Sequence, residues 1–134
     1  MQKFHPILED QYYINSLKYL LQGNQLTNTN MKIIYFYETK DKELVDEKIN
    51  ILKLSFPDNE FFSIDNILED WEQLLIMSLC KYNIIANSTF SWWAAYFNTN
   101  VDKKVCYPSL WFGELKNHLI TNDLFPEDWI KIEV

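Results

Sequence analysis

The chain has 134 residues, a usual size for one domain, and a chain of that length buries a core without disulfides or metals. Hydrophobic residues make up 48% of it, aromatic residues 16% and charged residues 23%, which excludes an intrinsically disordered chain. The formal net charge of −7 is spread along the sequence, and no basic cluster accompanies an aromatic run. This pattern excludes a nucleic-acid-binding surface.

The sequence lacks the marks of a secreted, membrane-spanning or metal-binding protein. Cys80 and Cys106 have no metal-type spacing, so we interpret both as buried free thiols in a reducing compartment. The first residues contain no apolar signal-peptide core, and nowhere do about 18 apolar residues run together. His5 and His118 are isolated and are expected to be surface or capping residues. We expect one soluble domain over residues 1–134.

Apolar spacing predicts helices alternating with short strands. The predicted elements are, in chain order, a helix over 9–22, a strand over 33–37, a helix starting at 41, a strand over 60–65, a helix whose stripe runs from 71 to 82, a strand over 83–87, a helix over 89–98 and a strand over 104–107 closed by Pro108. Residues after Pro108 have weak periodicity and are expected to lie across the domain, anchored by Trp111 and Trp129. Such alternation predicts an α/β fold with one parallel sheet and helices on both faces.

One turn carries the polar groups expected at a ligand site. In open α/β sheets, ligands lie beyond the carboxyl ends of the strands, where a helix N-terminus offers unpaired N–H groups to a phosphate. Asn87, Ser88, Thr89 and Ser91 bring an amide and three hydroxyls to such a turn, enough donors for a pyrophosphate. The alternative is that Ser88 or Asn87 simply caps the helix.

Two further features of the sequence have a packing or solvent interpretation and a ligand interpretation. Trp92, Trp93, Ala94 and Ala95 favour close packing of the helix, with sugar stacking as the alternative. Glu38, at the carboxyl end of the first predicted strand, is placed to contact a nucleotide or sugar, although a solvated carboxylate is the commoner role of such a residue.

The run from Ile84 to Tyr96, preceded by Met77 to Tyr82, resembles the signature of the α-1,2-fucosyltransferase family, glycosyltransferase family 11. The segments from Phe4 to Leu8, Lys104 to Trp111 and Pro126 to Ile130 also resemble that family. The resemblance implies the C-terminal, Rossmann-like half of a GT-B glycosyltransferase. It further implies transfer of fucose from GDP-fucose to a galactoside acceptor glycan with inversion, without a metal or other cofactor, and places Asn87, Ser88, Thr89 and Ser91 at the donor diphosphate.

The chain departs from the family in two elements. Family members carry an H-x-R-x-G-D-Y motif on a strand before the first helix, whereas this chain contains no Arg, and their Ser-Asp-Asp is replaced by Tyr37-Glu38-Thr39. By the resemblance, the motif strand lies centrally in the sheet. The chain is therefore expected to pair residues 33–37 directly with 84–87, to take a strand from another copy or partner, or to be marginally stable.

The resemblance leaves two functions open. The first is a galactoside 2-α-L-fucosyltransferase that works with a separate N-terminal GT-B half or a second copy. The second is a catalytically inactive module that binds a nucleotide sugar or a partner, which the absence of Arg favours. The sequence assigns no catalytic base. The expected location is cytoplasmic, with membrane association through an N-terminal region that these residues do not contain.

Overall fold

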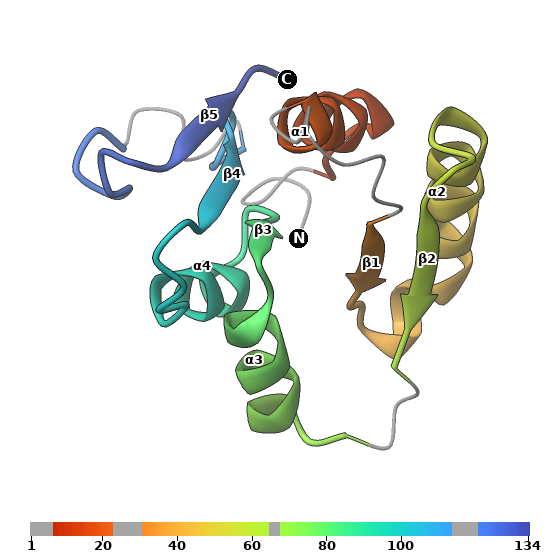
Figure 1. Ribbon diagram of the computed structural model, residues 1–134, viewed down its shortest axis with the longest axis horizontal. Helices are drawn as coiled ribbons and strands as arrows, with labels where there is room; N and C mark the ends of the chain where they lie inside the picture. Colours follow the sequence, from red (N-terminus) through yellow and green to blue (C-terminus); the bar gives the residue numbers. More distant parts are fainter. Residues whose placement is uncertain (1–6, 23–30, 65–67, 114–120) are drawn as a thin grey trace.

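The computed structural model describes residues 7–22, 31–64, 68–113 and 121–134, which form an α/β fold of parallel strands and flanking helices (Figure 1). The elements are α1 (Asp10–Gln22), β1 (Lys32–Tyr35), the 3-10 helix η1 (Thr39–Asp41), α2 (Lys42–Ser55), β2 (Glu60–Ser63), α3 (Asp70–Leu79), β3 (Tyr82–Ile84), α4 (Thr89–Tyr96), β4 (Lys104–Pro108) and β5 (Ile130–Ile132). The predicted alternation of helices and strands is confirmed, with shorter elements.

The strands form two parallel sheets instead of the single sheet predicted. One sheet pairs β1 with β2, and the other has the order β3-β4-β5. The predicted direct pairing of residues 33–37 with 84–87 is wrong, because β1 and β3 do not pair. Instead α1 spans the two sheets: its Leu17 packs in the core around β1 and β2, and its Tyr12 and Leu20 pack in the core around β4 and β5.

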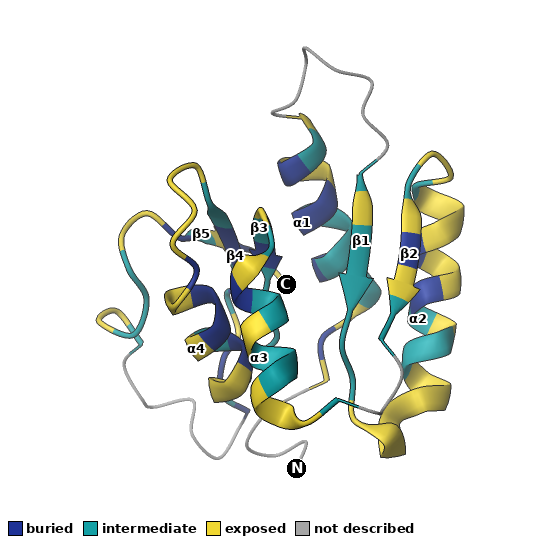
Figure 2. Cartoon of the chain, turned by 60° about the horizontal axis from the view of Figure 1, so that its bottom comes forward, coloured by how far each residue is buried: buried dark blue, intermediate teal, exposed yellow. Residues whose placement is uncertain are grey.

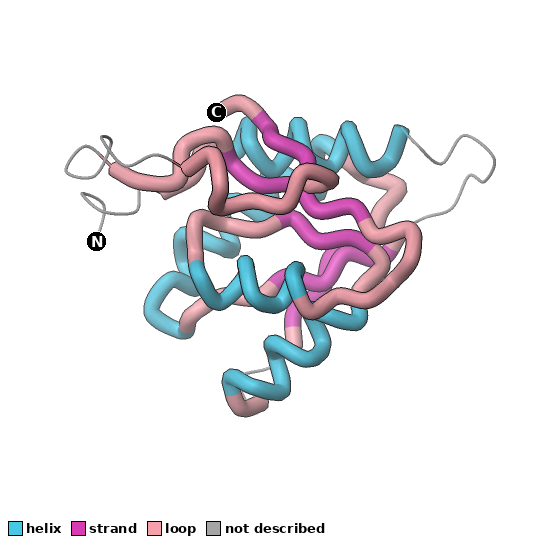
Figure 3. The backbone as a smooth tube through the Cα atoms, turned by 90° about the vertical axis from the view of Figure 1, so that its left-hand side faces the viewer, coloured by secondary structure: helices cyan, strands magenta, loops and turns pink. Residues whose placement is uncertain are grey.

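Helices cover both sides of the strands, as Figure 3 shows. Helices α1 and α2 pack against each other, and so do α3 and α4. Figure 2 shows the outer surface of α2 exposed and one face of α1 buried. No helix in the described ranges is long and apolar enough to cross a membrane.

The C-terminal stretch contains a fifth strand that apolar spacing did not predict. Strand β5 pairs in parallel with β4, with Cys106 opposite Ile130 and Pro108 opposite Ile132. Pro108 is therefore the last residue of β4 instead of following it. Trp111 and Trp129 are both buried in one core, so the predicted anchoring is confirmed.

Helix α1 buries Tyr12, Ser16, Leu17 and Leu20. Tyr12 is fully buried, and its hydroxyl donates to the carbonyl oxygen of Ile85 and lies 3.2 Å from that of Cys106. Burial raises the pKa of Tyr12, so the phenol stays neutral and remains a donor. This contact connects α1 to β4 and to Ile85, which follows β3 and precedes the turn that carries the predicted site.

A second buried contact fixes the ends of β3 and α4. The Asn98 side-chain amide donates to the carbonyl oxygen of Cys80 at 2.6 Å and to Oδ1 of Asn83 at 2.8 Å. Helix α4 ends at Tyr96, two residues earlier than predicted, and Asn98 lies beyond its end. The predicted strand over 83–87 is also shorter, although the N–H of Ile85 still donates to the carbonyl of Cys106 at 3.0 Å.

Both cysteines are free thiols, as predicted. Cys106 is fully buried, whereas Cys80 is only partly buried, so the expected burial is confirmed for Cys106 alone. His5 and His118 lie outside the described residues.

Candidate functional site

The turn between β3 and α4 is organised by Ser88, the N-cap of α4. Ser88 has φ −136° and ψ 131°, and its Oγ accepts from the N–H of Ser91 at 3.5 Å. Its carbonyl oxygen accepts from the N–H of Trp92 at 3.0 Å. The capping interpretation of Ser88 is therefore confirmed, and the turn has a fixed backbone conformation.

Two of the predicted site residues direct their side chains into the protein. The Ser91 hydroxyl, which has a single proton to donate, lies 3.0 Å from the carbonyl oxygen of Ser88 and 3.2 Å from that of Ala86. The Asn87 side-chain amide donates to the carbonyl oxygen of Trp111 at 3.3 Å. Both side chains therefore support the turn itself.

The donors at the turn are the hydroxyl groups of Ser88 and Thr89 and the backbone N–H groups at the start of α4. The first N–H groups of an α-helix have no intrahelical partner, and here the N–H groups of Thr89 and Phe90 are the two at the start of the helix. The aligned peptide dipoles place partial positive charge at the same point. Together they form a backbone site suited to an anion.

A cavity of about 540 Å³ lies beside this helix start. Its walls come from the segments that follow β1 and β3, from α3 and the segment before it, and from the first turn of α4. The lining residues are Phe36, Tyr37, Glu38, Thr39, Leu68, Asp70, Gln73, Met77, Ala86, Ser88, Phe90 and Ser91. The structure thus brings Glu38, Ser88 and Ser91 together. It does not bring Asn87 or Thr89 into the lining.

The charges at the cavity are carboxylates and helix termini. Glu38 and Asp70 line it, and no lysine is among its described lining residues. Glu38 pairs with Lys40 at 3.0 Å, and the hydrogen bond from this pairing raises the pKa of Lys40. Both side chains are more than half exposed, so the pair is screened by water. The positive potential offered by the described lining therefore comes from the N-termini of α3 and α4.

Comparison with known proteins identifies the family. The profile of glycosyl transferase family 11 matches residues 47–133, which is more than half of the chain and includes the whole turn from Asn87 to Ser91. The chain belongs to glycosyltransferase family 11. The resemblance to the α-1,2-fucosyltransferase family is thereby confirmed. Glu38 lies outside the matched residues, whereas Asp70 and Gln73 lie inside them.

Two curated relatives from Escherichia coli align with nearly all of this family 11 chain. The O-antigen biosynthesis glycosyltransferase WbnK is 33% identical over 97% of the chain and 38% of its own length. An alpha-1,2-colitosyltransferase is 33% identical over 98% of the chain and 41% of its own length. The chain therefore spans about two fifths of these relatives. No solved structure matches it significantly.

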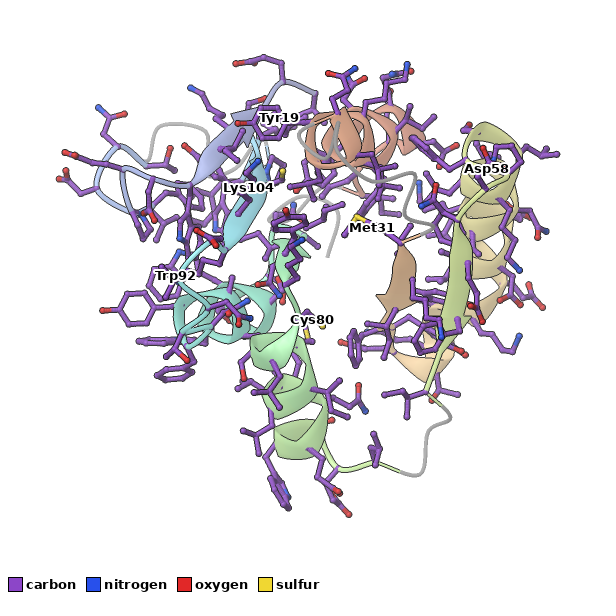
Figure 4. The ribbon with its side chains drawn as sticks, viewed as in Figure 1. Tyr19, Met31, Asp58, Cys80, Trp92 and Lys104 are labelled. Carbon is purple, nitrogen blue, oxygen red and sulfur yellow. The ribbon has the colours of Figure 1, made fainter. Side chains whose placement is uncertain are left out.

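The aromatic residues of α4 divide between packing and exposure. Trp92 stacks on Tyr96 at 5.1 Å between ring centroids, contacts Trp129 at 5.5 Å, and donates its indole N–H to the carbonyl of Leu124 at 3.0 Å (Figure 4). The packing role predicted for it is confirmed. Trp93 is 47% exposed and stacks on Phe97, so it is not packed between the sheet and a neighbour as predicted.

The sequence prediction missed Asp70, Gln73 and Phe90 of the cavity lining. Asp70 and Gln73 lie in the first turns of α3, the helix that follows β2 in the chain. The rule that ligands lie beyond the carboxyl ends of parallel strands, applied to β2 as it was to β3, would have found them.

Proposed function

We propose that residues 1–134 form a domain equivalent to the C-terminal half of a GT-B glycosyltransferase, and that it binds a GDP-sugar donor. The donor is GDP-fucose or a closely related GDP-deoxysugar, and the reaction is its transfer with inversion to a galactoside hydroxyl. Family membership supports the reaction class. The observation that carries the site is the cavity at the start of α4, beyond β1 and β3.

The start of α4 and the cavity beside it suggest a division of roles. The N–H groups of Thr89 and Phe90 and the dipole of α4 bind the diphosphate, with the Ser88 side chain at the same helix start. The carboxylate of Glu38 accepts hydrogen bonds from ribose hydroxyls or guanine N–H groups, and Asn87 and Ser91 hold the turn. A cavity of about 540 Å³ falls in the size range of small-molecule sites, about 300–1,000 Å³.

A second candidate is donor binding without turnover by these residues alone. The observation that favours it is charge: the sequence has no Arg, and no lysine is among the described residues lining the cavity. A leaving diphosphate needs charge stabilisation that oriented N–H groups supply in part. Assay of fucose transfer to a galactoside separates the candidates, since both predict GDP binding but only the first predicts product.

The donor site is tested by placing a negative charge at the start of α4 without removing the cap. Asp and Asn both cap helices as well as Ser does, so Ser88→Asp and Ser88→Asn should melt at nearly the temperature of the parent chain. The carboxylate introduced by Ser88→Asp would repel a diphosphate, so we expect GDP affinity to fall by about tenfold or more in this variant, equivalent to about 1.4 kcal/mol.

Isothermal titration calorimetry with GDP and GDP-fucose measures this effect. The matched Ser88→Asn variant has a side chain of the same size as Asp and caps the helix, but it carries no charge. Its GDP affinity should stay within about threefold of that of the parent, a difference in binding free energy of less than about 1 kcal/mol. Equal GDP affinities of the parent and Ser88→Asp, in folded proteins, would refute the assignment of the diphosphate to this turn.

A further inference from the structure

An exposed apolar face, here called the aromatic face, lies on α3 and α4 (Figure 2). Residues three or four positions apart lie on one side of a helix, so its members form one stripe on each helix. Two cavities of about 170 and 230 Å³ lie between the two sheets, and no residue of the aromatic face is among their described lining residues. The members of the aromatic face are Trp71, Leu75 and Leu79 of α3, Phe90 and Trp93 of α4, and Phe97 at the end of α4.

The two stripes lie side by side because α3 and α4 run in the same direction and pack against each other (Figure 1). The first turns of both helices line the donor cavity, with Asp70 in α3 and Phe90 in α4. At the other end, the side chain of Asn98, beyond α4, donates to the carbonyl oxygen of Cys80, beyond α3. Each turn of the α3 stripe therefore lies beside a turn of the α4 stripe, which makes one continuous face.

The aromatic face is large for the surface of a monomer. Its four aromatic residues are between 38% and 64% exposed. A large aromatic side chain has about 200 Å² to bury, so the four leave about 400 Å² in water. The two leucines are exposed as well, and so is Tyr96, whose ring centroid lies 5.7 Å from that of Trp93. The total exceeds the largest apolar patch of a typical monomer, about 300–600 Å², and approaches the area that each partner buries in a standard interface, about 800 Å².

The two ends of the α3 stripe carry opposite charges. Glu69 and Asp70 are exposed at the start of α3, and Lys81 is exposed beyond its end. Beyond α4, Asp102 and Lys103 are neighbours of opposite sign and add no net charge. An anionic membrane fits this pattern poorly, because interfacial helices carry basic residues around their apolar side. A copy of the same face, turned end for end, is complementary to it.

We propose that the aromatic face binds the same face of a second copy, which gives a two-fold symmetric dimer whose α3 helices run antiparallel. Leu75 and Trp93, at the middle of the face, then lie across the axis from their own equivalents. Glu69 of each copy lies near Lys81 of the other, whereas a parallel arrangement would oppose carboxylates. Because such a contact closes on itself, assembly stops at two copies. The dimer does not depend on a nucleotide.

Sedimentation velocity of residues 1–134 without GDP tests the dimer. An interface of this size is expected to dissociate in the micromolar range or more tightly, so the chain should be dimeric at about 100 µM. A folded chain that stays monomeric at this concentration overturns the proposal, whether or not the monomer binds phosphatidylcholine vesicles. Assembly beyond two copies overturns it too.

Matched substitutions localise the contact. Leu75→Lys sets two like charges close together at the axis and should weaken association by about tenfold or more. Leu54→Lys is the same change on α2, where Leu54 is 84% exposed outside the aromatic face, and it should leave association within about twofold of the parent. Equal association of Leu75→Lys and the parent contradicts the proposed interface.

A charge exchange tests the antiparallel arrangement. Glu69→Lys and Lys81→Glu each remove an opposite-charge contact, so each should weaken association by about threefold, the small effect expected of exposed charges. The double variant restores opposite charges and should return to within about twofold of the parent. A double variant that associates no more tightly than either single variant overturns the arrangement.

Hydrogen exchange of the parent chain decides the matter if Leu75→Lys fails to fold. On going from a dilute to a concentrated solution, the amides of α3 and α4 should become more protected, while those of α2 stay unchanged. Added protection in α2 alone, or none in any helix, overturns the proposal.

Discussion

At the scale of single residues, two hydroxyl groups hold the candidate site from opposite sides. Ser88 caps α4 and fixes the start of the helix. Tyr12, from the other end of the sequence, donates to the carbonyl of Ile85 just before that turn. Neither role needs a charged group, and the burial that raises the pKa of Tyr12 keeps its hydroxyl protonated. The site is therefore positioned by neutral hydrogen bonds.

The Tyr12 contact predicts a measurable loss of stability. Tyr12→Phe keeps the ring but leaves the buried carbonyl of Ile85 without its donor, so we expect the free energy of unfolding to fall by about 1–3 kcal/mol. Urea denaturation measures it. Tyr19→Phe is the matched control, because Tyr19 is 44% exposed. Removal of its hydroxyl should change the free energy of unfolding by less than about 0.5 kcal/mol. Equal stability of the two variants would show that the Tyr12 hydroxyl contributes nothing.

Sequence reasoning located the turn but did not predict what each of its side chains contacts. Polar residues after a buried strand predicted a helix start, and the structure places Ser88 there. The direction of a side chain depends on distant backbone: Asn87 donates to the carbonyl of Trp111, 24 residues away. Tyr12 was missed because its partners belong to strands more than 70 residues further along the chain. Such contacts leave no local pattern.

At the scale of elements, a buried amide network sets the spacing of α3, β3 and α4. Asn98 donates to Asn83 and to the carbonyl of Cys80, and the Asn83 amide donates to the carbonyl of Met77 at 2.8 Å. Both side chains are at least nine-tenths buried. The candidate turn lies between β3 and α4. The network therefore holds the start of β3 next to the segment that follows the end of α4.

Removing Asn98 tests the network. In Asn98→Ala the carbonyl of Cys80 keeps its bond from the Asn100 side chain at 2.9 Å, but Oδ1 of Asn83 loses its donor, so we expect a loss of about 2 kcal/mol. The measurement is thermal unfolding by circular dichroism. Asn50→Ala, on the exposed side of α2, is the control and should be neutral or slightly stabilising. A neutral Asn98→Ala would contradict this role.

Element types were predictable from spacing, while sheet composition was not. Helices α1 to α3 carry apolar periodicity and α4 is apolar on most of its surface, but β5 has three residues and no alternation long enough to detect. Direct pairing of residues 33–37 with 84–87 was one of three outcomes expected for the sheet. The structure does not show it, since β1 pairs with β2 and β3 pairs with β4. The residues of a segment indicate that it is a strand but not which strand lies beside it. The resemblance anticipated a missing central strand but could not decide among the outcomes.

At the scale of the whole molecule, an acidic chain without Arg carries a cavity where we propose that it binds an anion. The net charge of −7 opposes GDP at long range, so local N–H groups at α4 must provide the capture. The cavities between the two sheets and the proposed donor cavity are adjacent, because Phe36 and Met77 line all three.

The most direct test of the donor site is a ¹H–¹⁵N NMR titration of residues 1–134 with GDP. The account predicts that the backbone amides of Thr89 and Phe90 shift most, together with those of Tyr37, Glu38 and Thr39 across the cavity. Amides of β5 should not move. A saturating GDP titration that leaves the amides of Thr89 and Phe90 unchanged, or shifts amides only away from the cavity, would contradict the central claim.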